Sequence, residues 1–211
     1  MNKLPGCDLQ YCPATQDYAS QVINLLGNIS ADTQYFIYGA EDLRSKYLIR
    51  EFCCDKGYFG YSQHRLMLVN GRCVGVIAAY DRSEIKRLNW GTLNSIFSFY
   101  PFPQAIKCMY RLLASTSATP KPSNDSYFLY NLAVDPEFSR QGIGSQLLEH
   151  EISLARNRKY KVVELDVATT NQHAISLYLR HGFLIKHLIN NNRTPNGFRF
   201  DSHLRMVLRL Q

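Results

Sequence analysis

Residues 138–148, FSRQGIGSQLL, place two glycines one residue apart at the point where a helical pattern begins. The first turn of a helix has backbone N–H groups without partners and a partial positive charge, so it favours an anion. A glycine there lacks the Cβ that would keep a phosphate at a distance. Gly142 and Gly144 therefore indicate a pyrophosphate-binding turn, although glycines at a tight strand-to-helix turn also occur for steric reasons alone. The spacing matches neither GxxxxGK[ST] nor the three-glycine dinucleotide motif.

The segments on either side of this turn alternate between strand and helix patterns. Residues 127–134, YFLYNLAV, are typical of a strand that ends at Asp135-Pro136. Apolar residues between 143 and 155 share one helical face, and the basic run RNRKYK closes that helix in agreement with its dipole. Residues 162–167, VVELDV, alternate as in a strand. A strand–helix–strand unit of this kind calls for parallel strands joined by a right-handed crossover.

The rest of the chain supplies antiparallel neighbours for this unit. We expect a strand at 8–13, helices at 14–26 and 39–57, the second with Gly57 as its C-cap, and a short helix that ends at Gly182. Asn70-Gly71 predicts a tight hairpin, because both positions tolerate positive φ. Residues 183–189 and 198–210 predict a final antiparallel pair. The fold class is therefore α/β, with a mixed, twisted sheet of six or seven strands flanked by helices.

Residues 84–119 form an aromatic-rich segment with a helical pattern that Pro101 and Pro103 interrupt. The segment is too short for a second core, so we expect one domain over 1–211 with a helical insertion at 84–119. We hypothesise that its aromatic side chains either wall an acceptor site or bury a subunit interface. The second role would make the protein a homodimer.

The composition fits a soluble, cytoplasmic protein. No apolar stretch approaches the length of a membrane span, and the N-terminal segment is mostly polar. The six cysteines include no CxxC pair, so neither a disulfide framework nor a zinc site is expected, and we predict no metal. The formal charge of +7 comes from Lys and Arg spread along the chain, which disfavours nucleic-acid binding. A polyphosphate ligand would also explain the excess.

Two motifs in this order resemble the acetyl-CoA-binding core of the GNAT superfamily of N-acetyltransferases. VDPEFSRQGIGSQLL is similar to its Q/R-x-x-G-x-G/A loop and the V-x-P turn before it, and NQHAISLYLRHGF is similar to its N-x-x-A-x-x-L-Y-x-x-x-G-F segment. The tail DSHLRMVLRL resembles the closing strand, in which an Asp precedes a Met. The close match covers about residues 127–184. One departure is Ser139, which stands where the loop has Gln or Arg, with Arg140 beside it.

The resemblance implies a GNAT-like fold whose parallel strands splay near the strand ending at Val134, so that acetyl-CoA enters between them. The implied activity is acetyl transfer from acetyl-CoA to a primary amine by direct attack, without a covalent enzyme intermediate. The strand before the loop would meet the pantetheine arm and the thioester, and the loop would hold the pyrophosphate. The cofactor-binding residues carried over in this way are Leu132, Ala133, Val134, Arg140, Gln141, Gly142, Ile143, Gly144, Ser145, Asn171 and Ala174.

Tyr178 matches the usual general acid of the family, and it would protonate the departing thiolate. Full transfer from a tyrosine of pKa ~10 to a thiolate of pKa ~8.5 is uphill by about 2 kcal/mol, unless the site lowers the pKa of the tyrosine. The alternative for Tyr178 is a core aromatic on a helix face.

The general base is left open by the sequence. Family members often have a Glu on the strand before the loop, but Tyr130-Asn131 offers no carboxylate there. Ordered water, His203, Asp201 and Glu51 are the candidates. The basic residues of 156–161 could meet the adenosine 3′-phosphate or could form a solvated helix end.

The acceptor cannot be read from the sequence. Small amines, amino acids, antibiotics, protein N-termini and lysines all remain open, because acceptor pockets are built from loops without a portable signature. A non-catalytic acyl-CoA sensor or binding module is the rival function, and the missing carboxylate favours it.

Overall fold

The computed structural model describes residues 9–27, 29, 31–117, 119–190 and 195–210. Predictions for residue 8 and for residues 191–194 lie outside this part of the chain. The strands are β1 (Leu9–Pro13), β2 (His64–Val69), β3 (Arg72–Asp81), β4 (Ser126–Val134), β5 (Val162–Ala168), β6 (Leu184–Ile189) and β7 (His203–Arg209). The helices are α1 (Ala19–Gly27), α2 (Ala31–Tyr38), α3 (Glu41–Cys54), α4 (Ile85–Phe99), α5 (Phe102–Thr116), α6 (Ile143–Asn157) and α7 (Gln172–Arg180).

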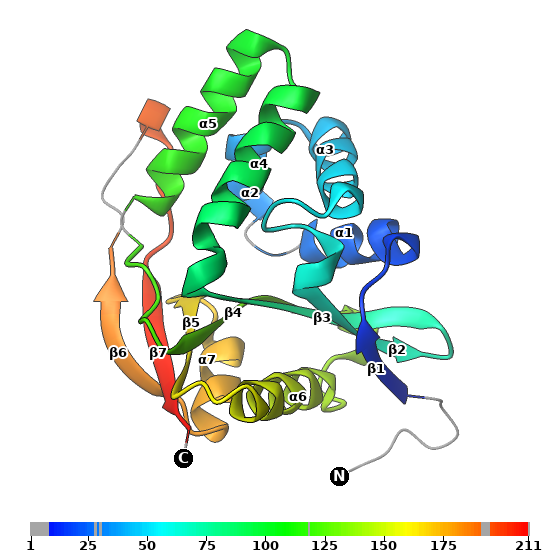
Figure 1. Ribbon diagram of the computed structural model, residues 1–211, viewed down its shortest axis with the longest axis vertical. Coiled ribbons are helices and arrows are strands. Elements are labelled where there is room, and N and C mark those ends of the chain that lie inside the picture. The colour runs from blue at the N-terminus through cyan, green and yellow to red at the C-terminus, as the bar shows by residue number, and fades with distance from the viewer. Residues whose placement is uncertain (1–8, 28, 30, 118, 191–194, 211) are drawn as a thin grey trace.

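The strands form one mixed sheet of seven strands in the order β1-β2-β3-β4-β5-β7-β6. β4 and β5 run parallel, and the other neighbouring pairs are antiparallel. Figure 1 shows α1 to α5 on one face of this sheet and α6 with α7 on the other. The predicted α/β class with a mixed sheet and a parallel β4–α6–β5 unit is therefore confirmed.

Each face of the sheet has its own apolar core. On the first face, Tyr47 and Phe52 of α3 are fully buried together with Leu66 of β2. On the second face α6 supplies a buried row, and burying each large apolar side chain stabilises the fold by about 1.5–3 kcal/mol. This row fixes α6, and hence the glycine turn before it, against the sheet. The row consists of Ile143, Leu147, Leu148, Ile152 and Ala155, the face that the sequence predicts.

The β2–β3 hairpin turns at the predicted dipeptide. Val69 pairs with Arg72, so the loop has two residues. Asn70 and Gly71 have φ values of 49° and 79°, which is the left-handed pair that a type I′ turn requires.

Two local predictions differ from the structure. α2 lies between the two expected N-terminal helices, at residues to which the sequence pattern assigned no element. α3 ends at Cys54 with Asp55 as its left-handed C-cap (φ 53°), so Gly57 is not the cap. A Cβ at Gly57 would instead overlap the carboxylate of Glu51, so close packing accounts for this glycine.

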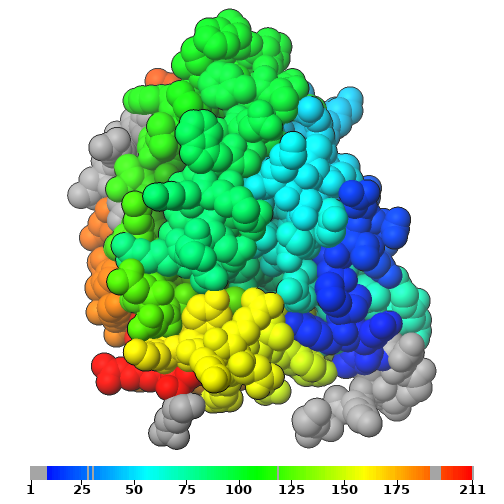
Figure 2. Space-filling view, in the orientation of Figure 1, coloured from blue at the N-terminus to red at the C-terminus, as the bar shows by residue number. Residues whose placement is uncertain are grey.

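The insertion is helical, as predicted, and it forms the pair α4–α5. Pro101 separates the two helices and is the N-cap of α5. Leu88, Ile96 and Ala105 are fully buried on the inner side, whereas Trp90 and Phe102 are 74% and 70% exposed. Figure 2 shows this pair forming the upper end of the molecule.

Candidate active site

The glycine turn follows a well-anchored corner at the end of β4. The Asp135 carboxylate accepts a hydrogen bond from the N–H of Glu137 at 3.0 Å, which caps the short 3₁₀ turn η4 (Pro136–Phe138). Arg72 of β3 pairs with the same carboxylate at 2.7 Å. The V-x-P part of the motif therefore fixes the place where α6 begins.

The first turn of α6 presents backbone donors without partners. Gly142 is its N-cap, and no side chain caps the helix. The first bond inside the helix runs from the N–H of Gln146 to the carbonyl of Gly142 at 3.0 Å. Residues 142–145 therefore have N–H groups with no acceptor among the described residues, and the positive end of the helix dipole lies there. A helix start of this kind can accept an anion.

The two glycines are needed for different reasons. Gly142 has φ 84°, a conformation that side chains disfavour, so the turn itself explains it. Gly144 lies within the helix, and a Cβ there would make ordinary contacts, at 3.5 Å to Leu177 and 3.6 Å to Val134. The fold alone does not require Gly144. The missing side chain at position 144 favours close approach of a ligand over the purely steric alternative.

Two side chains of the loop differ in role: Gln141 makes a hydrogen bond within the protein, and Arg140 is exposed to solvent. Gln141 donates its amide to the carbonyl of Glu137 at 3.0 Å, so it braces the loop from within. Arg140 has φ 60° and is exposed, with no ion pair to a described carboxylate. Ser139 is the residue that differs from the family motif, and the side chain of its neighbour Arg140 is therefore free to contact an anion.

The parallel strands separate beyond the middle of the sheet. β4 and β5 pair over Ser126–Leu129 and Val162–Leu165 and no further. Just after the last pair, Asn131 has φ 55° and the register of β4 against β3 shifts by one residue, which is a β-bulge. The predicted splay is therefore present, and the bulge marks where it starts.

A cleft of about 310 Å³ opens at this splay. Among the predicted site residues, Leu132, Asn171, Ala174 and Tyr178 line it. Ala133, Val134 and the loop at 140–145 are not in its lining, and no residue of α4 or α5 is either, so the insertion does not wall this cleft. The sequence assigned no role to other lining residues, which include Tyr130, Asn131, Asp166, Ala168 and Thr170.

Tyr178 reaches this cleft from α7. The residue is only 8% exposed, and its ring packs on Phe183 with the centroids 5.7 Å apart. No described group is hydrogen-bonded to its hydroxyl. Burial raises the pKa of Tyr178, which is opposite to the lowering that full proton transfer would need. The hydroxyl therefore keeps its proton and is available as a hydrogen-bond donor.

Asn171 has a structural role that the motif did not reveal. Its side-chain oxygen accepts a hydrogen bond from the N–H of Ala174 at 3.0 Å and so caps α7. Loss of such a cap typically costs about 1 kcal/mol. Asn171 also lines the cleft.

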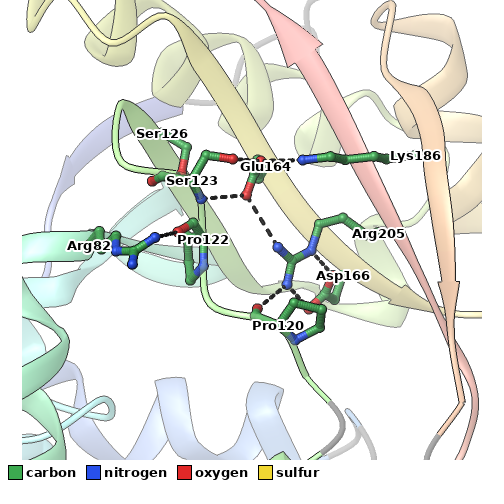
Figure 3. A network of polar contacts seen from close by, with 9 residues as sticks. All are labelled: Arg82, Pro120, Pro122, Ser123, Ser126, Glu164, Asp166, Lys186 and Arg205. Atoms are coloured by element: carbon green, nitrogen blue, oxygen red, sulfur yellow. Dashed lines mark hydrogen bonds and ion pairs between the residues drawn. The ribbon is translucent and has the colours of Figure 1, made fainter.

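Asp166 of β5 lines the cleft but is already paired (Figure 3). Arg205 of β7 donates to both of its carboxylate oxygens, with Nη2 at 3.0 Å from Oδ2. The same guanidinium reaches Glu164 at 3.2 Å and the carbonyl of Pro120 at 2.8 Å. Arg205 therefore neutralises both carboxylates and ties Pro120 to the sheet.

The base candidates separate clearly in space. Asp201 and His203 both line the cleft that Tyr178 lines. His203 is the first residue of β7, and Asp201 lies in the segment before it. The carbonyl of Asp201 lies 3.0 Å from Nδ1 of His203. Glu51 is fully buried, accepts from the Thr92 hydroxyl at 2.9 Å and does not line the cleft. Burial raises the pKa of Glu51, and its place in the core makes it a structural residue.

The basic residues of 156–161 lie at the C-terminal end of α6. The glycine turn begins the same 15-residue helix, so about 20 Å separates the two ends. Lys161 pairs with Asp125 at 3.2 Å, and Arg158 lies over the ring of Tyr127. The cluster is therefore distant from a pyrophosphate at the turn, and contact with the adenosine 3′-phosphate stays a prediction beside the solvated helix end.

Two further properties concern the described residues as a whole. They contain no group of three or more His, Cys, Asp or Glu side chains that could hold a metal ion. None of their helices combines the length and the apolar character that crossing a bilayer requires.

Comparison with known proteins places this geometry in a family. The model of the acetyltransferase (GNAT) family matches residues 26–183, which contain the glycine turn, the splayed strands and Tyr178. The chain belongs to the acetyltransferase (GNAT) family. The GNAT match ends at Phe183, so β6 and β7 lie beyond it. His203 is the first residue of β7.

Sequence identity to a curated relative in the GNAT family covers only part of the chain. The [ribosomal protein bS18]-alanine N-acetyltransferase of Escherichia coli strain K12 is 44% identical over 59 residues, which is 28% of this chain and 40% of that enzyme. The chain thus matches less than half of that relative. An N-acetyltransferase from Staphylococcus aureus Mu50 superimposes with a TM-score of 0.71 at 17% identity, covering 94% of this chain and 100% of the other. The crystal structure of the E. coli bS18-alanine enzyme gives a TM-score of 0.57 at 17% identity, over 96% and 94% of the two chains. These two structures support the fold.

Proposed function

We propose that this protein transfers an acetyl group from acetyl-CoA to a primary amine by direct attack of the amine on the thioester. The observation that supports it best is the pairing of an anion-binding turn at the start of α6 with a hydrogen-bond donor, Tyr178, in the adjacent cleft. Leu177, the neighbour of Tyr178, would lie 3.5 Å from a Cβ at Gly144, so α7 packs beside the turn and also lines the cleft.

The donor half of the reaction falls to backbone groups. The N–H groups of residues 142–145 and the side chain of Arg140 bind the pyrophosphate. The edge of β4 that faces β5 has no strand partner after Leu129. The N–H and C=O groups on that side of β4, which alternate along the strand, can therefore pair with an extended amide chain such as the pantetheine arm.

The acid role falls to Tyr178 as a hydrogen-bond donor. Negative charge develops on the sulfur as the thioester breaks, and a neutral hydroxyl at that point stabilises it. Because burial raises the pKa of Tyr178, we assign it stabilisation of the thiolate rather than complete proton transfer.

The base role falls to His203. The Asp201 carbonyl can only accept a hydrogen bond, so the proton of His203 is on Nδ1 and the lone pair is on Nε2. The imidazole lines the cleft and can take a proton from an ammonium acceptor. Asp166 cannot compete, because Arg205 holds it.

The class of amine stays open within this proposal. The name of the E. coli relative specifies an alanine of ribosomal protein bS18, but the similarity covers 40% of that enzyme. A protein N-terminus is therefore one acceptor class beside small amines. The cytoplasmic location and a homodimer stay predictions.

An assay of thiol release from acetyl-CoA over a panel of amines tests the proposal. The panel contains a polyamine, free amino acids and a peptide with N-terminal alanine, and mass spectrometry of the acceptor identifies the product. Acceptor-dependent thiol release with an acetylated product supports the enzyme. Acetyl-CoA binding without turnover on any amine would favour the sensor or binding module.

A further inference from the structure

A second cavity, of about 380 Å³, is lined by residues of α1, α2 and α3. These helices cover one face of the sheet (Figure 1). The cavity is separate from the cleft at Tyr178: Ile29 lines that cleft, whereas Gly27 and Ala31 on either side of Ile29 line this cavity. The full lining is Ile23, Asn24, Gly27, Ala31, Glu41, Arg44, Ser45 and Leu48. Nothing in the proposed acetyl transfer uses it.

Arg44 of α3 is the unusual member of this lining. The residue is only 8% exposed. Its guanidinium has five N–H donors, and one of them donates to the carbonyl of Ala31 at 3.3 Å. No described carboxylate lies within 4.0 Å of it. Buried charges in proteins are normally paired, as Arg205 is in this chain with Asp166 and Glu164.

Arg44 lines this cavity. We propose that this cavity binds a small aliphatic carboxylate, whose two oxygens accept hydrogen bonds from the Arg44 guanidinium. A planar guanidinium and a carboxylate match in a bidentate geometry, and the partly buried setting strengthens the pair.

The other lining residues favour one kind of anion over another by its charge and its apolar part. Ile23 and Leu48 are at most 2% exposed and supply apolar walls for a short alkyl group. Asn24 and Ser45 add neutral polar groups. Glu41 lines the same cavity and carries a negative charge, which repels a dianion more strongly than a monoanion. A monocarboxylate with a short alkyl tail therefore fits better than phosphate.

Two-dimensional ¹⁵N–¹H spectra of the full-length protein test the site, with sodium butyrate titrated against sodium chloride at equal ionic strength. We expect saturable shifts of the amides of Asn24, Arg44 and Ser45 with butyrate and not with chloride. Arg44→Gln should weaken butyrate binding at least about tenfold, whereas Lys46→Gln, which removes an exposed charge from the same helix, should leave it unchanged. Shifts that never saturate, or that persist in Arg44→Gln, would overturn the proposal.

A second variant covers the case in which Arg44→Gln fails to fold. Asn24→Asp places a carboxylate in the cavity, so it should occupy the guanidinium and abolish the butyrate response. Asn94→Asp, an exposed change of the same kind on α4, is its control and should keep the response. An undiminished response in Asn24→Asp contradicts the site, and inorganic phosphate binding more tightly than butyrate contradicts the carboxylate class.

Discussion

Leu129 of β4 and Leu165 of β5 are the last residues that the two parallel strands pair. Beyond them β4 continues to pair with β3 as far as Val134, and β5 continues to pair with β7 as far as Ala168. Each strand is therefore held on its other side while the space between the two opens. The cleft at Tyr178 is a property of the sheet and does not depend on a flexible loop.

The two glycines of the turn should respond in opposite directions to the same substitution. Gly142→Ala forces a side chain into φ 84° and should lower the free energy of unfolding by about 1–2 kcal/mol. Gly144→Ala adds a Cβ that meets ordinary contacts in a helix, and it should raise that free energy by about 0.5–1 kcal/mol. Urea denaturation measures both. Equal destabilisation by the two variants would show that position 144 is also a steric requirement of the fold.

Ser145→Glu should separate stability from donor binding. A carboxylate in the first turn of α6 interacts favourably with the helix dipole, by about 0.3–1 kcal/mol, so thermal stability should be kept or raised. The same charge repels a pyrophosphate, so the affinity for acetyl-CoA should fall at least about tenfold, which is about 1.4 kcal/mol. Calorimetric titration measures this affinity. Ser153→Glu on the exposed side of α6 is the control, and a loss of equal size there would contradict a local effect at the turn.

Local signals in the sequence predict much of this fold, and the errors have physical causes. Asn70-Gly71 and the buried face of α6 depend on neighbours a few residues away, so pattern alone predicts both. The eight residues of α2 are too few to show a clear helical period. Gly57 resembles a cap in sequence, yet its packing against Glu51 is set by a contact that only the tertiary structure reveals.

Part of the lining of the cleft was predictable for the same reason. The loop and the α7 segment are contiguous motifs, and Asn171, Ala174 and Tyr178 of the α7 segment line the cleft together with Leu132 of β4. The bulge at Asn131 and the pairing of Asp166 with Arg205 join strands that are distant in sequence, so no local pattern predicts them. The choice of general base between His203 and Glu51 likewise depends on which of the two lines the cleft, and the sequence does not show this.

His64 should make the protein less stable in mild acid. The residue is fully buried on β2, with Nδ1 at 2.8 Å from the carbonyl of Gly60, and burial lowers the pKa of His64 to about 4. As pH falls from ~6.5 to ~4 the unfolded chain takes up a proton that the folded protein excludes, so the free energy of unfolding falls by about 3 kcal/mol over that window. Above pH ~6.5 the imidazole is neutral in both states and the stabilisation is complete.

Denaturation by urea at pH ~7 and pH ~5 measures this effect. His64→Gln should lose less stability between the two pH values than the wild type, by about 2 kcal/mol. His173→Gln, at an exposed position of α7, should follow the wild type. An unchanged pH dependence in His64→Gln would show that another group is responsible.

His203→Gln should impair turnover in a pH-dependent way. Near pH ~7 most of a primary amine is protonated, so loss of the base should lower kcat/KM about tenfold or more. Near pH ~9 more of the amine is free, and the loss should shrink. The pH profile of kcat/KM measures both, with His187→Gln on the exposed β6 as the control. A loss of the same size at every pH would indicate a structural role for His203 instead.

Acetyl transfer by Tyr178→Phe tests the central claim most directly. The variant removes one hydroxyl that has no protein partner among the described residues, so folding and the affinity for acetyl-CoA should change little. The account predicts that kcat falls at least about 10²-fold, while Tyr110→Phe, at an exposed position of α5, keeps wild-type turnover. Wild-type kcat in Tyr178→Phe would contradict the proposed active site.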